Sequence, residues 1–248
     1  MKYSKLIKLN DSLSEIIHSN FELLTVFQRF GIKLGFGDKN ISEICEFYNI
    51  NHNFFIEIIN IFHDKEYFPD KKLQSFSIKL IVDFLKNSHV FYNDEKIPFI
   101  ESLIDELYWN TDDHDRNLSI LKKFFYEYKT EVKAHTLHEE ETVYPYAVYI
   151  EENCKYKDKL DDCYKKMKVY SITDYAKDHD DIEEKLTDLK NIIIKYLPPP
   201  QNQKTAIKIL FQLFLLEKDL NNHARIEEKI LVPKIMEMEM FLKSKIKL

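Results

Sequence analysis

Residues 135–140 read HTLHEE and are followed by Pro145, and residues 223–228 read HARIEE and are followed by Pro233. In both copies a glutamate stands four positions after the first histidine, and a proline stands ten positions after it. Four residues of an α-helix turn about 400° and rise about 6 Å, so the two residues of each pair share a helix face. We therefore expect two equivalent pairs, His135 with Glu139 and His223 with Glu227.

Both pairs continue an apolar stripe, because Val132 and Leu220 stand one turn before the two histidines. The stripe predicts that the pairs point into a helical core. A buried carboxylate costs several kcal/mol unless it is paired or binds a metal ion. A solvated charged face is the alternative interpretation, but the repetition of the spacing favours a metal site.

Four long helical patterns surround these pairs, at residues 74–109, 113–144, 167–197 and 203–240. The breaks between them fall at the turn sequence of residues 110–113, at a Tyr-rich connector that begins at Pro145, and at the triple proline of residues 198–200. Apolar residues recur at helical steps, for example in the series Leu121, Phe125, Tyr128 and Val132. We predict an all-α protein in which an up-down-up-down four-helix bundle over residues 74–248 follows a small helical domain over residues 1–70.

Two further histidines, His89 and His179, lie in step with the apolar residues of the first and third patterns. In an antiparallel pair of helices, residues equidistant from the turn lie at the same height. The midpoint of His89 and His135 is residue 112, and the midpoint of His179 and His223 is residue 201, so both midpoints fall at predicted turns. The bundle therefore places four histidines in one layer with the two glutamates.

This layer contains six predicted metal ligands: His89, His135, Glu139, His179, His223 and Glu227. Imidazole and carboxylate ligands together suit iron, manganese or zinc. A catalytic zinc ion usually takes three protein ligands, so six side chains suit two metal ions better than one. We expect the two glutamates to bridge the metals, two histidines to bind each metal, and an oxo or hydroxo bridge to leave an open position on each. A diatomic molecule or a peroxide could bind there.

The remaining histidines fit this layer less well. His138 faces about 100° away from Glu139, so we expect it at the surface or beside the site. His114 lies 21 residues before His135, which is roughly 30 Å along a helix, and it stays an outside candidate. Read alone, His89 would be a hydrogen-bonded core histidine and His179 a surface one. The histidines of the N-terminal domain are interpreted as structural.

Composition limits the class of protein. The formal net charge is −6, so no general basic field attracts nucleic acid or an anionic membrane. No run approaches 18 apolar residues, so we expect no membrane span. The three cysteines show no paired spacing, and the first residues lack the apolar core of a signal peptide, so we expect a reduced cytoplasmic protein.

The N-terminal domain contains three apolar stretches, at residues 11–29, 41–49 and 53–63, and we expect Asp11 and Ser42 to cap the first two. The three glycines of the chain lie between these stretches, within residues 31–37. The rhythm of residues 41–63 suggests a helix-turn-helix, but this segment contains no Lys or Arg, which argues against DNA binding.

The two repeated segments resemble the haemerythrin-like (HHE cation-binding) domain, and His89 and His179 stand where that domain has its other two histidines. The sequence FGIKLGFGD at residues 30–38, followed by ISEIC at residues 41–45, resembles the small N-terminal domain of the di-iron proteins for repair of iron centres. This resemblance implies two non-haem iron ions, and a role in the nitrosative and oxidative stress response. It implies binding or reduction of nitric oxide or oxygen species, and iron-sulfur proteins as clients of repair.

One departure changes this expectation. Gly35 and Phe36 occupy the place of the family's two adjacent cysteines, so thiol-based iron transfer by that loop is in doubt. Val90 also replaces a second histidine that is common beside His89 in the family. The alternative function is a haemerythrin-like sensor or store that binds oxygen, nitric oxide or iron without turnover. The aromatic N-terminal domain could mediate homodimer formation or contact a client protein.

Overall fold

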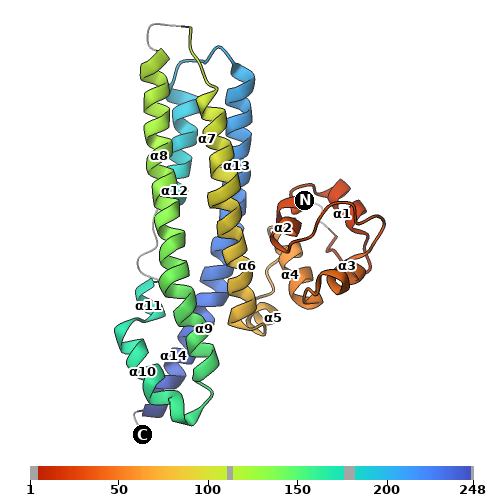
Figure 1. Cartoon of the computed structure of the whole chain (residues 1–248), viewed down its shortest axis with the longest axis vertical. Helices are drawn as coiled ribbons and strands as arrows, with labels where there is room; N and C mark the ends of the chain where they lie inside the picture. Colours follow the sequence, from red (N-terminus) through yellow and green to blue (C-terminus); the bar gives the residue numbers. More distant parts are fainter. Residues whose placement is uncertain (1–4, 111–113, 176–181, 247–248) are drawn as a thin grey trace. The chain divides into compact units, whose positions relative to one another are not determined.

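A computed structural model of the chain describes residues 5–110, 114–175 and 182–246, and its regular elements are helical (Figure 1). The β contact recorded in these residues is a single isolated bridge between Ser12 and Asn40. This confirms the all-α fold class. The chain divides into two compact units, one of residues 1–88 with 225–234 and one of residues 89–224 with 235–248.

The first unit begins with short helices: α1 (Leu13–Ser19), α2 (Leu23–Arg29), α3 (Ile41–Tyr48), α4 (His52–His63) and α5 (Asp70–Gln74). The predicted caps were wrong. Ser12 precedes α1 without a capping hydrogen bond from its side chain. Asn40 caps α3, because its side chain accepts from the backbone N–H of Glu43 while Glu43 accepts from the N–H of Asn40. This reciprocal capping box satisfies two otherwise unpaired donors, and Ser42 already lies inside the helix.

Aromatic side chains hold the first unit together. Phe30 stacks on Phe84 of α6 (Ile78–Val90), with ring centroids 5.2 Å apart, and it also packs edge-on against Phe55. The Arg29 guanidinium lies 5.5 Å from the centre of the Phe62 ring. The glycine-rich turn after α2 begins at Gly31, whose φ of +73° is costly for any residue with a Cβ atom. These contacts attach the N-terminal helices to α6.

The second unit contains α7 (Ile97–Asp105), α8 (His114–His138), α9 (Tyr144–Asn153), α10 (Leu160–Val169), α11 (Ile172–Tyr175), α12 (Ile182–Asn191), α13 (Gln203–Ile226) and most of α14 (Val232–Ile246), with a short 3-10 turn at Lys157–Lys159. Figure 1 shows α7, α8, α12 and α13 running side by side as a bundle. The predicted stripe of α8 is buried at all four positions, Leu121, Phe125, Tyr128 and Val132, and these residues belong to one core that all four helices share. The bundle is therefore confirmed.

Hydrogen bonds close one end of the bundle at the predicted turns. Trp109 is 5% exposed, and its indole N–H donates to the carbonyl of Pro198 at 2.7 Å. The Asn202 side chain donates to the carbonyl of Glu106 at 2.7 Å and accepts from the N–H of Tyr108. The segment after α7 is thereby tied to the segment before α13. None of the described helices is long and apolar enough to span a bilayer.

Three predicted helix limits were wrong. The second helical pattern does not end before Pro145. The chain stays helical after α8, passes through Pro145 within α9, and leaves the helix after Asn153. The fourth pattern, predicted to end at residue 240, continues as far as Ile246. The third pattern is not one helix, since α10 ends at Val169 and the non-helical residues Tyr170 and Ser171 separate it from α11.

Candidate metal centre

Four widened helical turns precede prolines of the chain. They are the π-helical segments η1 (Phe91–Lys96), η2 (Glu139–Val143), η4 (Ile192–Tyr196) and η5 (Glu227–Leu231). Each of them ends two residues before a proline, namely Pro98, Pro145, Pro198 or Pro233. A proline lacks the N–H for the normal helical bond, and its ring collides with the carbonyl four residues earlier. For Pro98, Pro145 and Pro233, which lie within continuing helices, that carbonyl lies inside the π-helical segment, where i→i+5 bonding makes room for the ring. The helix before Pro198 instead ends at Tyr196, and Leu197 is extended.

The same turns position predicted ligands. Glu139 is the first residue of η2, Glu227 is the first residue of η5, and η1 begins two residues after His89. π-Helical turns interrupt the regular packing of a helix and occur often at functional sites. The proline ten residues after each repeated histidine therefore has a structural reason, because it fixes a wide turn at the glutamate.

Four of the predicted ligands form a buried group: His89, Glu139, His223 and Glu227. One candidate ligand atom from each of them lies within 4.8 Å of those of the others. The Nε2 atoms of His89 and His223 are 3.3 Å apart. All four residues are at most 6% exposed, so water cannot replace a missing partner.

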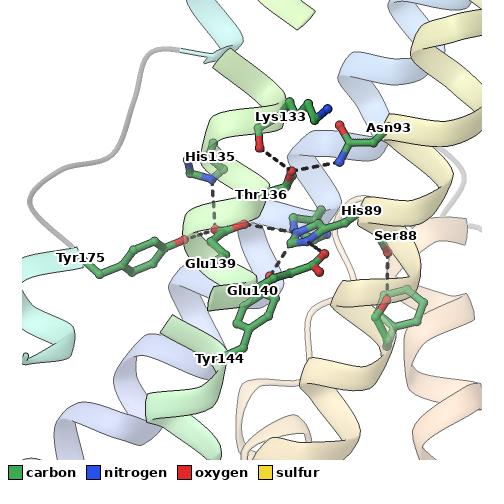
Figure 2. A network of polar contacts seen from close by, with 12 residues as sticks. Ser88, His89, Asn93, Lys133, His135, Thr136, Glu139, Glu140, Tyr144 and Tyr175 are labelled. Carbon is green, nitrogen blue, oxygen red and sulfur yellow. Dashed lines mark hydrogen bonds and ion pairs between the residues drawn. The ribbon is translucent and has the colours of Figure 1, made fainter. Parts of the chain in front are cut away.

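Glu139 is fully buried and its two oxygens face different histidines (Figure 2). Oε1 lies 3.0 Å from Nε2 of His135, and Oε2 lies 3.2 Å from Nε2 of His89. Burial alone would raise the pKa of this carboxyl group, but the contacts with His135 and His89 outweigh it and hold the pKa well below its usual range. Glu139 is therefore an ionised carboxylate in a dry core, with one oxygen available on each side.

Further side chains orient the histidines. Glu140 lies 2.8 Å from Nδ1 of His89, which leaves Nε2 of this ring directed at the buried group. The Tyr144 ring stacks on His89, and its hydroxyl lies 3.2 Å from Nε2 (Figure 2). The Tyr92 ring packs edge-on against His223, and its hydroxyl donates to Asp219 at 2.6 Å. A carboxylate that fixes the second nitrogen of a histidine is the usual support for a metal ligand.

Residues 99–235 match the family described as the Hemerythrin HHE cation binding domain. The chain belongs to this haemerythrin family. The matched segment covers more than half of the chain and contains both His/Glu repeats, whereas His89 lies ten residues before it. A comparison with curated proteins finds no match. Family membership and the buried group of histidines and glutamates together indicate that this haemerythrin domain binds metal, with iron as the metal that the family suggests.

The structure brings the predicted ligands of the haemerythrin domain together to different degrees. The buried group contains His89, Glu139, His223 and Glu227. His135 lies next to it, since its Nε2 atom is 3.0 Å from Oε1 of Glu139. His179 lies outside the described residues. His114 is the first residue of α8, the helix that carries His135 near its other end. His138 is exposed, as its helical position predicts.

Sequence reasoning did not identify two tyrosines at the site, Tyr144 and Tyr175. Tyr144 stands five residues after Glu139 and, once the helix is known to continue through Pro145, its place beside the core could have been found. Tyr175 donates a hydrogen bond to Oε1 of Glu139 from a different helix, α11, so no local pattern indicates it.

The donors fit a metal ion by chemistry and by spacing. Two ligands at right angles around a metal, each about 2.1 Å from it, lie about 3 Å apart. The separations between His89 and His223 and between His89 and Glu139 are 3.3 and 3.2 Å, close to this value. Nitrogen and carboxylate oxygen donors suit iron, and no cysteine is among the donors of the group.

Proposed function

We propose that this haemerythrin-family chain is a non-haem di-iron protein. In this proposal His89 and His223 bind one iron ion, His135 and His179 bind the other, and Glu139 and Glu227 bridge the two. The spacing of the histidines around one carboxylate supports the assignment. The two domains of the proposal, residues 1–70 and 74–248, are those that the sequence pattern predicts.

The observation that carries the proposal is the environment of Glu139. Its oxygens face His135 on one side and His89 on the other, at 3.0 and 3.2 Å, in a core from which water is excluded. A carboxylate that formed a single ion pair would need only one of these two histidines as a partner. A bridging carboxylate needs a nitrogen ligand near each oxygen, which is the arrangement present.

Bound iron would supply one-electron chemistry and open positions for a small ligand. The chain itself would supply orientation and exclusion of water. Glu140 holds His89 from its outer nitrogen, and the Tyr144 ring covers that histidine. The burial of the group keeps competing water away and strengthens each electrostatic contact.

We further propose that the ligand is nitric oxide or an oxygen species, and that the protein serves the nitrosative and oxidative stress response by supporting repair of iron-sulfur centres. The resemblance of residues 30–45 to the N-terminal domain of iron-centre repair proteins supports this role. Because Gly35 and Phe36 replace the cysteine pair, the contribution of the N-terminal domain to repair would not depend on thiols in that loop.

The iron content of freshly purified protein tests the metal assignment. We expect two iron ions per chain, and far fewer would contradict the proposal. An intact di-iron spectrum in the Glu139→Ala, Glu227→Ala double variant would contradict the bridging roles. His138→Ala is the matched control, since this histidine lies one residue from Glu139 but is exposed, and its iron content should stay unchanged.

The alternative is a sensor or store that binds its ligand without turnover, and the missing cysteine pair favours it. Stopped-flow mixing of the reduced protein with nitric oxide separates the two functions. Repeated consumption with release of nitrous oxide supports an enzyme. A stable stoichiometric adduct supports a binding module.

A further inference from the structure

Tyr175 contacts the carboxylate on which the metal assignment depends. It is 6% exposed, and its hydroxyl donates to Oε1 of Glu139 (Figure 2). The same oxygen lies 3.0 Å from Nε2 of His135. Tyr175 therefore stands on the His135 side of Glu139, whereas Tyr144 and Glu140 stand on the His89 side.

Tyr175 is carried by α11, which is described over Ile172–Tyr175. Tyr170 and Ser171 separate the start of α11 from the end of α10. The first N–H groups of a helix have no acceptor within it, so a contact from another element can fix this start.

Glu239 of α14 supplies that contact. It is 2% exposed, and its carboxylate accepts from the N–H of Ile172 at 2.8 Å and from the hydroxyl of Ser171 at 2.7 Å. It also accepts from the hydroxyl of Tyr146 at 2.5 Å. All three donors are neutral. Among the described residues these hydrogen bonds offset the cost of burying the Glu239 carboxylate.

Two of those donors, Ser171 and Ile172, stand at the start of α11, and Tyr175 of the same helix reaches Glu139. One buried glutamate thus holds the start of α11, and the tyrosine of this helix holds a second buried glutamate. The chain of contacts runs from α14 through α11 to η2, entirely by hydrogen bonds between buried or half-buried groups.

We infer that Tyr175 and Glu239 are positioning residues of the metal centre. Tyr175 fixes the direction of the Glu139 oxygen that faces His135, and Glu239 fixes the start of the helix that carries Tyr175. The inference rests on the proposed di-iron site and names the residues that tune the metal on the His135 side. Groups that orient metal ligands in this way typically change metal affinity by about 10- to 100-fold.

Tyr175→Phe tests the first step, because it removes only the hydroxyl. Ferrous iron is added to the metal-free protein without oxygen, and a chelator then competes for it. We expect one iron ion per chain to be held as in the wild type and the second about 10- to 100-fold more weakly. The thermal midpoint of the metal-free variant should stay near that of the wild type, which separates positioning from a general loss of structure.

Glu239→Gln tests the second step, and Glu237→Gln is its control. Glu237→Gln changes an exposed glutamate of the same helix, so it should preserve both iron affinities. Glu239→Gln should weaken the same iron ion as Tyr175→Phe. If Glu239→Gln does not fold, the iron affinities of Tyr175→Phe alone test the positioning role.

Three results would overturn the inference. If the wild type binds two iron ions and Tyr175→Phe holds both equally well, the positioning role fails while the di-iron site stands. A phenolate-to-iron charge-transfer band in the ferric wild type that is lost in Tyr175→Phe would make Tyr175 a ligand instead. If the wild type does not bind two iron ions, the proposed function fails and this inference fails with it.

Discussion

The two His/Glu repeats have the same local structure but different surroundings. In both, a long helix passes into a π-helical turn at the glutamate and continues through a proline. His223 is 6% exposed, whereas the side chain of His135 is 18% exposed. Glu140 of the first copy lies 2.8 Å from Nδ1 of His89. Local spacing thus determines the turn, and the rest of the fold determines what the turn does.

The largest effect should come from the glutamates themselves. If the two copies are equivalent as bridges, Glu139→Ala and Glu227→Ala should each reduce the iron content from two ions to at most one, because a bridging carboxylate contributes to both metals. Metal analysis of the purified single variants measures this. Retention of two iron ions in only one of the variants would show that the copies are not equivalent.

The prolines test whether the wide turns matter for the metal. Pro145→Ala and Pro233→Ala restore a backbone N–H and remove the ring, so the turns can tighten to ordinary α-helix. We expect helix content to be kept and iron affinity to fall by about tenfold, because the glutamate at the start of each turn is redirected. Pro198→Ala is the control, since η4 carries no predicted ligand. Circular dichroism and competition with a chelator give the two readouts, and equal iron affinity in all three variants would refute the role of the turns.

Glu140 and Glu228 test the difference between the copies. Glu140→Gln weakens the contact that orients His89, so iron affinity should fall by about 10-fold or more. Glu228→Gln changes an exposed side chain and should have a smaller effect. The same chelator competition measures both. A larger effect of Glu228→Gln would reverse the comparison.

The smallest effect concerns the helix that continues from the first copy. Cys154 follows its last residue, Asn153, and burial, a hydrogen bond with Cys163 and the charge of Glu239 raise the pKa of the Cys154 thiol to about 12. The unfolded thiol has a pKa of about 8.5, so between these values the unfolded chain loses a proton that the folded chain keeps. The free energy of unfolding should therefore fall as the pH rises above about 8.5.

Urea unfolding at several pH values, in the presence of a reductant, measures this slope. Cys154→Ala should make it shallower. An unchanged slope would show that this thiol does not contribute to the pH dependence.

Much of the fold was predictable because it depends on periodicity. The stripe of α8 and the repeated His/Glu spacing read directly from the sequence, and they predicted the bundle and the inward direction of Glu139. The helix limit at Pro145 failed for a physical reason. A proline was interpreted as a helix end, but a wider turn before it can absorb the ring.

The supporting residues of the site were less predictable. Tyr175 reaches Glu139 from α11, a different helix from the one that carries Glu139, so no local spacing links the two residues. Glu239 acts through the backbone of Ile172, and a contact with a backbone N–H has no sequence signature at the donor. The cap of α3 was misplaced by two residues because Ser42 and Asn40 are both good capping residues, and only the capping box with Glu43 distinguishes them.

The protein contains a single tryptophan, Trp109, which is buried at the end of the bundle and hydrogen-bonded to Pro198. Its fluorescence is consequently a reporter of the second unit alone, while far-ultraviolet circular dichroism sums the helices of both units. Denaturation followed by the two signals would coincide if the chain unfolds in one cooperative step, and would separate if the N-terminal helices melt independently.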